Sequence, residues 1–431
     1  MRETSFLEIS DSIGSRLCRD AIWSGERCNW LGWALDAVNN SWTLVYRAQN
    51  TNLYDGTAGI ALFLGRLFSL THDPLQKMTA IAAINQAVSG IAEMPEKIRP
   101  SVYSGAVGIG YTAIDLGLIL ADDGMVSQGL KIVREASQVS SDCWLDVLGG
   151  SAGTIQALLN VGSRLDAPDL VDLATAHGQL LLRTAVKSDR GWSWDTLPGQ
   201  TQQHLAGYGH GAAGIGCALI ELWAATHDPE CLEGAREAFR YERSHFSRQH
   251  HNWPDLRSFG PSTPASQPSF AMAWCHGAPG IGLSRLRAVE LIDDREVEQD
   301  LDEALQGTVD ACSHVVFPAS GSLCLCHGLG GNADLLLCAA ESNRRSDLRQ
   351  VAENIGRQAI AQLRRDDLPW PCGVNGGGET PNLMLGLAGI GHFFLRLHDP
   401  VKTPSLLLLS AFPAKTQIFN FIDRPELALA G

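Results

Sequence analysis

The sequence predicts an all-α protein built as an α/α-toroid, a double ring of about seven inner and seven outer helices. A glycine turn followed by an apolar run recurs seven times along the chain, and a more charged amphipathic stretch separates successive copies. A closed ring also removes the need for the capping repeats that an open solenoid requires. Strand signals are weak throughout the chain.

The seven turns share a Gly-x-x-Gly core. Their first glycines, the anchor glycines, stand at positions 56, 105, 150, 211, 277, 328 and 386, so the successive gaps are 49, 45, 61, 66, 51 and 58 residues. Each gap leaves room for two helices and two connections. Glycine at such a turn allows one helix to begin close against its neighbour.

Each turn is expected to lead into an inner helix and then an outer one. The runs that follow the turns are apolar on more than one face, as in a helix buried all round, and include 60–70, 215–225 and 281–291. The amphipathic stretches that predict outer helices include 75–94, 125–139, 231–246 and 297–315.

The connections carry their own signals. His-Asp-Pro recurs at 72–74, 227–229 and 398–400, and Asp as an N-cap followed by Pro at the first helical position predicts a helix start. Residues 247–269 predict a surface loop, and the glycine-rich stretch 369–380 predicts a second, flexible loop.

The repeats run almost end to end, which favours a single domain over residues 1–431. Within it, residues 1–24 are expected as an N-terminal extension or first helix, and residues 409–431 as a C-terminal tail.

The overall composition limits the partners and the location. A formal net charge of −14 argues against nucleic acid as the main partner. Charges occupy the N-terminal positions where a signal peptide would be apolar, and no segment is long and apolar enough to span a bilayer. The eleven scattered cysteines are typical of free thiols in a reducing cytoplasm.

Two of the turns carry a Cys-His-Gly triplet, and the two triplets begin 51 residues apart at Cys275 and Cys326. In a toroid, equivalent turns face the same end of the central cavity. Thiolates and imidazoles from two such turns can supply three ligands and leave a fourth position open, which is the pattern of a catalytic zinc.

Other turns add polar residues at equivalent positions. His210 directly precedes the fourth anchor glycine, and Asp146 lies just ahead of the third turn. Tyr54 and Tyr103 occupy, in the first two repeats, the position that Cys275 occupies in the fifth.

Five motifs at matching repeat positions carry a family resemblance. Trp-Cys-His-Gly-Ala-Pro-Gly at 274–280, Cys-His-Gly at 326–328, Gly-Tyr-Gly-His-Gly at 207–211, Asp-Val-Leu-Gly-Gly-Ser-Ala-Gly at 146–153 and Asn-Leu-Met-Leu-Gly-Leu-Ala-Gly at 382–389 resemble the lanthionine cyclases of the LanC family. The likeness is closest to the C-terminal cyclase portion of class II, LanM-type, lanthipeptide synthetases. It covers about residues 25–408.

The resemblance implies roles for individual residues. The family's zinc ligands correspond to Cys275, Cys326 and His327. Its acid/base histidine corresponds to His210, and an aspartate implicated in the reaction corresponds to Asp146.

Three further residues are candidates for substrate contact or for support of the ligands. His276 is not a ligand in the family's scheme, so a supporting hydrogen bond and a substrate contact both stay open for it. Tyr54 and Tyr103 are candidates of the same kind.

The implied substrate is a precursor peptide whose Ser or Thr residues have been dehydrated, and the nucleophile is a cysteine thiol of the same peptide. Only a few per cent of such a thiol is ionised at neutral pH, and zinc would deprotonate it. The enolate formed by addition must then be protonated, which suits a histidine of near-neutral pKa.

Several alternatives stay open. Asp146 could instead be a helix N-cap, and Cys324, two residues before Cys326, is expected to be a buried small residue. The protein could add glutathione to dehydrated residues, or serve as a non-catalytic module that binds a leader peptide. It is expected to act with a separate dehydratase or as a piece of a larger synthetase.

Overall fold

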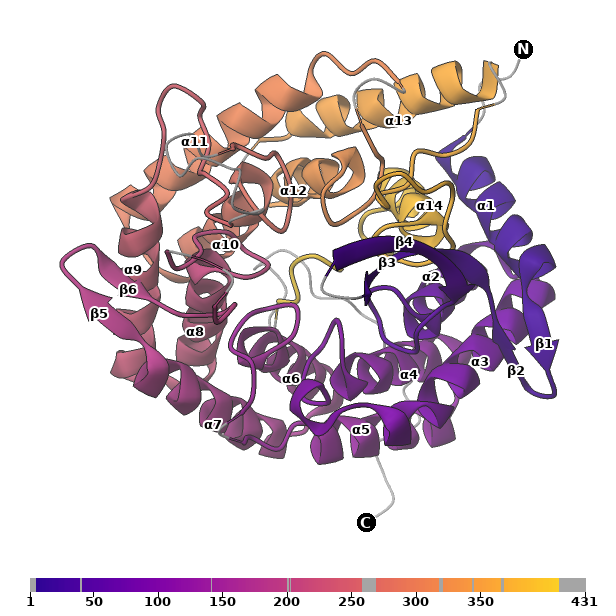
Figure 1. The fold of residues 1–431 in the computed structure, drawn as a ribbon, viewed down its shortest axis with the longest axis horizontal. Helices are drawn as coiled ribbons and strands as arrows, with labels where there is room; N and C mark the ends of the chain where they lie inside the picture. Colours follow the sequence, from indigo (N-terminus) through magenta and orange to yellow (C-terminus); the bar gives the residue numbers. More distant parts are fainter. Residues whose placement is uncertain are drawn as a thin grey trace, which may run out of the picture.

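A double ring of helices forms the protein (Figure 1). The structure, a computed structural model, describes residues 5–38, 41–140, 142–199, 201, 203–257, 269–317, 321–342, 345–365 and 368–410. Within these ranges the chain forms fourteen α-helices, two short 3-10 helices and three two-stranded sheets. Among the same residues, no helix combines the length and the apolar character needed to cross a membrane.

The inner ring consists of the helices that follow the glycine turns: α2 (Thr57–Thr71), α4 (Ala106–Leu120), α6 (Ser151–Leu165), α8 (Ala212–Thr226), α10 (Ala278–Leu291), α12 (Leu329–Glu341) and α14 (Leu387–His398). These helices are surrounded by protein; in α4, every residue from Ala106 to Gly117 is buried. The predicted inner helices are therefore confirmed.

The outer ring contains α3 (Pro74–Ser89), α5 (Asp123–Ala136), α7 (Asp169–Thr184), α9 (Pro229–Arg243), α11 (Arg295–Cys312) and α13 (Leu348–Arg365). Two 3-10 helices, η1 (Ile91–Glu93) and η2 (Glu96–Ile98), follow α3. The outer helices bury one face only; α5 buries little more than Gly129 and Val133. The four predicted amphipathic stretches coincide with α3, α5, α9 and α11.

The N-terminal helix α1 (Phe6–Asp20) completes the outer ring. It packs on α14, and the Ser10 hydroxyl donates a hydrogen bond to the Gly391 carbonyl (3.0 Å). The expected N-terminal extension is therefore the outer partner of the last inner helix, and the two ends of the repeat array share one helix pair.

This closure explains why one predicted helix start is wrong. Asp73 and Asp228 cap α3 and α9, where they accept hydrogen bonds from Leu75 N (2.8 Å) and Glu230 N (3.0 Å). In the third His-Asp-Pro, Asp399 instead ends α14, and its carboxylate accepts from Lys402 N (3.0 Å). No outer helix begins there because α1 already occupies that place.

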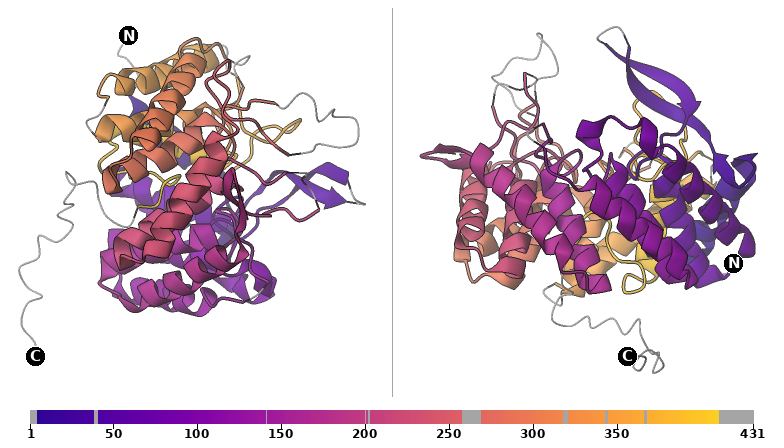
Figure 2. Two further views of the ribbon diagram at one scale, coloured as in Figure 1. Left: turned by 90° about the vertical axis from the view of Figure 1, so that its left-hand side faces the viewer. Right: turned by 90° about the horizontal axis from the view of Figure 1, so that it is seen from below.

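The strands form three antiparallel hairpins, which the weak strand signals of the sequence had not indicated: β1 (Ile22–Ser24) with β2 (Arg27–Asn29), β3 (Leu31–Val38) with β4 (Ser41–Ala48), and β5 (Val186–Ser188) with β6 (Gly191–Ser193). Figure 2 shows β3–β4 projecting from one end of the ring. Its register pairs Trp33 with Tyr46 and Leu35 with Leu44, which places these apolar side chains on one face.

The last described residues run into the middle of the ring (Figure 1). Leu406 and Leu407 are buried, and their carbonyls accept hydrogen bonds from the Tyr103 hydroxyl (2.6 Å) and from Trp274 Nε1 (3.0 Å). The centre of the toroid is therefore packed with protein. Residues 411–431 of the expected C-terminal tail lie outside the described residues.

A layer of charged side chains lies ten residues after the anchor glycines. It consists of Arg66, Asp115, Glu221, Arg287 and Arg396, with Asn160 and Cys338 at the same position in the other two repeats. Neighbouring inner helices pair these groups: Arg66 Nε is 3.0 Å from Asp115, and Arg287 Nε is 2.6 Å from Glu221. We call these seven residues the far layer, because they lie toward the opposite ends of the inner helices from the turns.

Candidate functional site

Backbone hydrogen bonds join the glycine turns into a belt at one end of the ring. Cys275 N donates to the Cys326 carbonyl (3.3 Å), Cys326 N to that of Met384 (3.1 Å), and Met384 N to that of Tyr54 (2.9 Å). From donor to acceptor, the whole belt runs through Leu148, Gly209, Cys275, Cys326, Met384, Tyr54 and Tyr103. Between Tyr103 and Leu148 the Ser104 hydroxyl provides the link (3.2 Å).

The belt holds successive turns in close contact. Gly209 N donates to the Cys275 carbonyl (3.0 Å), and a Cβ at position 209 would lie only 3.0 Å from that of Cys275. Glycine at 209 therefore lets the turn that carries His210 lie directly against the turn that carries Cys275.

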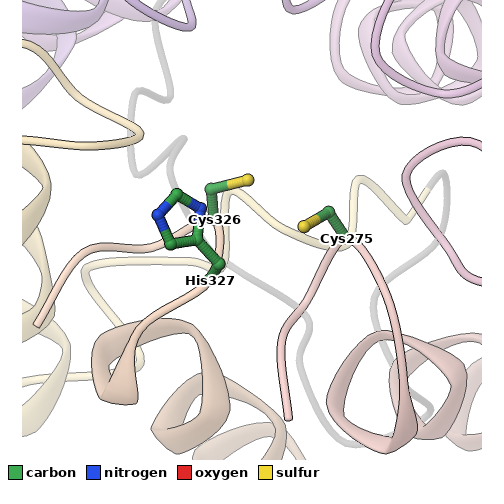
Figure 3. A group of neighbouring side chains, drawn as sticks. All are labelled: Cys275, Cys326 and His327. Carbon is green, nitrogen blue, oxygen red and sulfur yellow. The ribbon is translucent and has the colours of Figure 1, made fainter. Parts of the chain in front are cut away.

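Three candidate ligands come together from two neighbouring turns. One ligand atom each from Cys275, Cys326 and His327 lies within 4.8 Å of the others. Figure 3 shows the two sulfur atoms pointing toward each other, with the His327 ring beside Cys326. Both thiols are buried and His327 is exposed. The cluster therefore sits where the buried rim meets solvent.

The orientation of His327 leaves one nitrogen for a ligand. Its Nε2 donates to the Gly373 carbonyl (2.9 Å), so Nδ1 is the nitrogen available to a metal. Gly373 belongs to the predicted loop 369–380, and Gly373 N in turn donates to the Leu385 carbonyl (2.7 Å). This loop therefore supports the cluster.

The two thiols shift each other's pKa in opposite directions. The hydrogen bond from Cys326, assisted by the charges of His327 and Arg257, outweighs burial and lowers the pKa of the Cys275 thiol to about 6. The same hydrogen bond, together with burial, raises the pKa of Cys326 well above its ordinary value. The surrounding chain shields the His327 ring from part of the solvent, and this desolvation disfavours the charged form of the ring. The hydrogen bond with Cys324 and the charges of Cys324 and Cys275 outweigh it and raise the pKa of His327 to about 9.

The donor set fits zinc. Two thiolates and one imidazole are ligands that Zn²⁺ prefers, and three protein ligands leave a fourth position open. Donor atoms of a tetrahedral zinc lie about 3.3–3.8 Å apart, given metal–ligand distances of about 2.0–2.3 Å. Donors already within 4.8 Å need only a small movement to reach that geometry.

A second pair lies in the neighbouring turns. His210 Nδ1 is 2.5 Å from Asp146 Oδ2, and Asp146 is 1% exposed. Burial disfavours the charged form of His210, but the hydrogen bond and the charge of Asp146 outweigh it and raise the pKa of His210. Asp146 is not the N-cap of α6, since Gly150 holds that position; its other oxygen accepts from Gly149 N (2.7 Å).

The three remaining candidates, Tyr54, His276 and Tyr103, lie in different surroundings. The Tyr54 hydroxyl lies within hydrogen-bonding reach of the Cys326 thiol. The buried ring of His276 lies beside that of His210, with 5.7 Å between the ring centroids. Tyr103 lies deeper, because its hydroxyl is bound to the Leu406 carbonyl, so its ring supports the central segment.

The structure adds two residues that the sequence interpretation missed, Asp255 and Arg257. Both belong to the predicted surface loop 247–269, of which residues 258–268 lie outside the described part of the chain. Asp255 Oδ1 is 3.8 Å from His276 Nδ1, and Arg257 forms an ion pair with Asp255 (2.7 Å). An Asp-Leu-Arg stretch has no periodic or motif signal that would have singled it out.

Cys324 is not one of the three clustered ligands, although its thiol lies within hydrogen-bonding reach of the His327 ring. It is fully buried and accepts a hydrogen bond from the Ser322 hydroxyl (3.2 Å). This placement agrees with the expected buried small residue.

A family model described as lanthionine synthetase C-like protein matches residues 47–408. Among curated proteins, the lacticin 481/lactococcin biosynthesis protein LcnDR2 of Lactococcus lactis subsp. lactis is 24% identical over 263 residues. That match covers 58% of this chain and 25% of LcnDR2, so the chain spans about a quarter of its relative's length.

Among solved structures, nisin cyclase matches with a TM-score of 0.59 at 18% identity. The match covers 84% of this chain and 93% of nisin cyclase. At this level of identity the likeness concerns the fold, and it confirms the α/α-toroid that the repeats predicted.

Proposed function

The chain belongs to the lanthionine synthetase C-like family, and we propose that it is a zinc-dependent lanthionine cyclase. It adds cysteine thiolates of a dehydrated precursor peptide to dehydroalanine or dehydrobutyrine residues of the same peptide, and so forms thioether rings. One observation carries the proposal: a Cys–Cys–His cluster and a partly buried His–Asp pair occupy adjacent turns of one rim.

Cys275, Cys326 and His327 would hold the metal. When bound, zinc supplies a Lewis acid that converts the substrate thiol into a thiolate at neutral pH. Tyr54 contributes a hydrogen bond to Cys326, and the Gly373 carbonyl fixes the ring of His327.

His210 acts as the general acid. Addition of sulfur to the alkene leaves an enolate that needs a proton at its α-carbon, and a protonated histidine held by Asp146 supplies it. Because Asp146 raises the pKa of His210, the ring keeps its proton to a higher pH than a free histidine. The carboxylate also fixes the ring, so Nε2 is the nitrogen that delivers the proton.

The partner is a dehydrated precursor peptide, so a dehydration activity, on a separate enzyme or elsewhere in a larger synthetase, must act before cyclisation. The likeness to LcnDR2, a lacticin 481/lactococcin biosynthesis protein, supports a role in lantibiotic biosynthesis. A reducing compartment such as the cytoplasm suits the reaction, because both the site and the substrate need free thiols.

The test is to incubate the reduced, zinc-loaded protein with a dehydrated precursor peptide and to follow free thiol and peptide mass together. Ring formation consumes thiol and leaves the mass unchanged. Glutathione supplied in the same assay distinguishes the alternatives. A gain in mass equal to added glutathione would favour intermolecular thiol addition, and peptide binding with no loss of thiol would favour a non-catalytic module. Either result would contradict the proposal.

A further inference from the structure

The proposed reaction needs a group that no residue assigned so far provides. When sulfur adds to the β-carbon of a dehydrated residue, negative charge develops on the carbonyl oxygen of that residue. Fixed hydrogen-bond donors at such an oxygen are usually a large part of catalysis. The residues assigned above bind the thiol or protonate the α-carbon, and none of them is assigned to the oxygen.

The segment 252–257 is fastened to the turn that carries Cys275. Asn252 Oδ1 accepts hydrogen bonds from Ala278 N (2.7 Å) and Trp253 N (2.8 Å), and Asn252 Nδ2 donates to the Ala271 carbonyl (3.1 Å). Gly277 allows this approach with a φ of +102°, because a Cβ there would lie 2.9 Å from Asn252 Oδ1. The segment therefore has a fixed position relative to the candidate ligands.

Arg257 is held at the end of that segment. Its Nε donates to Asp255 Oδ1 (3.0 Å), a terminal nitrogen donates to Oδ2 (2.7 Å), and its backbone N–H donates to Oδ1 (3.1 Å). The Asp255 carboxylate is buried, whereas the Arg257 side chain is 31% exposed. Its partner Asp255 lies 3.8 Å from His276 Nδ1, and the His276 ring lies beside that of His210. A permanent cation is therefore anchored beside the turns that carry Cys275 and His210, and its charge acts on both residues.

A second observation marks this place as one for a ligand. His276 is 3% exposed, and its Nε2 makes no hydrogen bond within the described part of the chain. The same ring lies beside Asp255 on one side and His210 on the other. A buried nitrogen without a partner costs free energy unless a bound polar group satisfies it.

We propose that Arg257 binds the carbonyl oxygen of the dehydrated residue and stabilises the enolate, with Asp255 as its positioning residue. The inference rests on the proposed function and deepens it. The sulfur lone pair forms the C–S bond to the β-carbon, and the alkene electrons move onto the carbonyl oxygen. Arg257 donates hydrogen bonds to that oxygen and transfers no proton. His210 then delivers its proton to the α-carbon and the carbonyl re-forms, while the proton released by the substrate thiol returns His210 to its protonated form.

The test compares Arg257→Gln, Arg257→Lys and Arg257→Ala with a matched control. The control is Arg134→Gln, because Arg134 makes a similar two-bond pair with Asp169 on the outer surface (2.7 and 2.9 Å). Loss of one oxyanion donor typically lowers kcat by about 10²–10³. We expect that loss for Arg257→Gln, with full zinc content and little change in KM, and a smaller loss for Arg257→Lys. Methylguanidinium added to Arg257→Ala should restore part of the rate, and Arg134→Gln should behave as the wild type.

The outcomes separate this inference from the function beneath it. If the wild type forms no rings, the proposed function is wrong, and so is the inference that rests on it. If the wild type forms rings and Arg257→Gln does so with the same kcat, the inference alone is overturned. A fall in zinc content that matches the fall in rate would also overturn it, because Arg257 would then support the metal cluster instead of the enolate.

Discussion

The two ends of the inner helices use polar residues in opposite ways. At the turn end, the site shifts the pKa of three ionisable groups, that of Cys275 downward and those of Cys326 and His210 upward, and these groups lie where the rim opens to solvent. In the far layer, the five charged residues, Arg66, Asp115, Glu221, Arg287 and Arg396, form ion pairs inside the protein.

The difference lies in the kinds of ionisable group that each end brings together. The far layer pairs opposite charges: Asp115 is shared by Arg66 (3.0 Å) and Arg164 (2.7 Å). The turn end brings together two thiols that shift each other's pKa, and it keeps His276 Nε2 without a hydrogen bond in the described residues. On the proposed function, one repeated unit therefore supports reactivity at one end and cohesion at the other. The variants below test that division, from the largest expected effect to the smallest.

Removal of a candidate ligand should have the largest effect. In Cys326→Ala, we expect bound zinc to fall from about one ion per chain to near none, because two protein ligands hold zinc poorly. Cyclisation should fall to the uncatalysed rate while the helical circular-dichroism signal stays. Cys324→Ala is the matched control and should keep most of its zinc. Equal zinc loss in the two variants would mean that the wrong thiol was assigned.

Removal of the general acid should come next. His210→Asn should keep its zinc and slow ring formation by about 10²–10⁴. Zinc content and the loss of free thiol are measured on the same sample. Loss of zinc would make His210 a ligand, and unchanged cyclisation would make it a structural residue.

Asp146→Asn sharpens the same prediction. Without the carboxylate, burial of His210 is no longer opposed, so its pKa should fall. The rate should then decline at a lower pH than in the wild type, because the protonated acid is lost earlier as pH rises. A pH–rate profile that does not move would place Asp146 outside the proton transfer.

A substitution in the far layer should lower the free energy of unfolding and leave the rate of cyclisation unchanged. Glu221→Gln removes the charge that faces the buried Arg287 (2.6 Å). Losing one partner of a buried pair costs about 3–5 kcal/mol, whereas Arg134→Gln at an exposed pair should cost less than about 1 kcal/mol. Denaturant unfolding measures both. Below the unfolding transition, kcat and zinc content should match the wild type; a loss of activity there would show that the two ends are coupled.

Replacement of His177, a buried histidine of α7, should have the smallest effect, and only at acidic pH. Burial lowers the pKa of His177 to about 4, and the neutral ring bonds Ser151 Oγ (2.9 Å) and the Ser137 carbonyl (3.1 Å). An unfolded histidine titrates near 6.5, so the unfolded state binds more protons between pH 6.5 and 4. The free energy of unfolding should therefore decrease by about 3 kcal/mol as pH falls through that window. In His177→Gln this decrease should disappear; a decrease that persists would contradict the assignment.

The sequence predicted the repeated helix pairs but not the contact between α1 and α14 that closes the ring. Gly56 and its equivalents marked the inner helices because each precedes a long apolar run, and Cys275 and Cys326 stood out because they occupy equivalent turn positions. The role of α1 depends on packing against α14 and has no local signal. Arg257 reaches the site through tertiary contacts of Asn252, which no spacing reveals.

Two features could have been found. Asn39-Asn40 between stretches of alternating apolar residues indicates a hairpin, and β3 and β4 flank it. Counting ten residues from each anchor glycine finds the far layer, since the periodicity that locates the turns also aligns Arg66 with Arg287 and Arg396.

The pairing of α1 with α14 also governs how the chain folds. Every inner helix except α14 packs on an outer helix close to it in sequence, so these pairs can form rapidly as local units. The closing contact joins Ser10 to Gly391, 381 residues apart, and closing so long a loop costs about 5 kcal/mol of chain entropy. During synthesis the hydrogen bond from Met384 to Tyr54 must await the last repeat. The ring therefore closes late, and until then the first repeats present an open apolar edge to the surrounding solution.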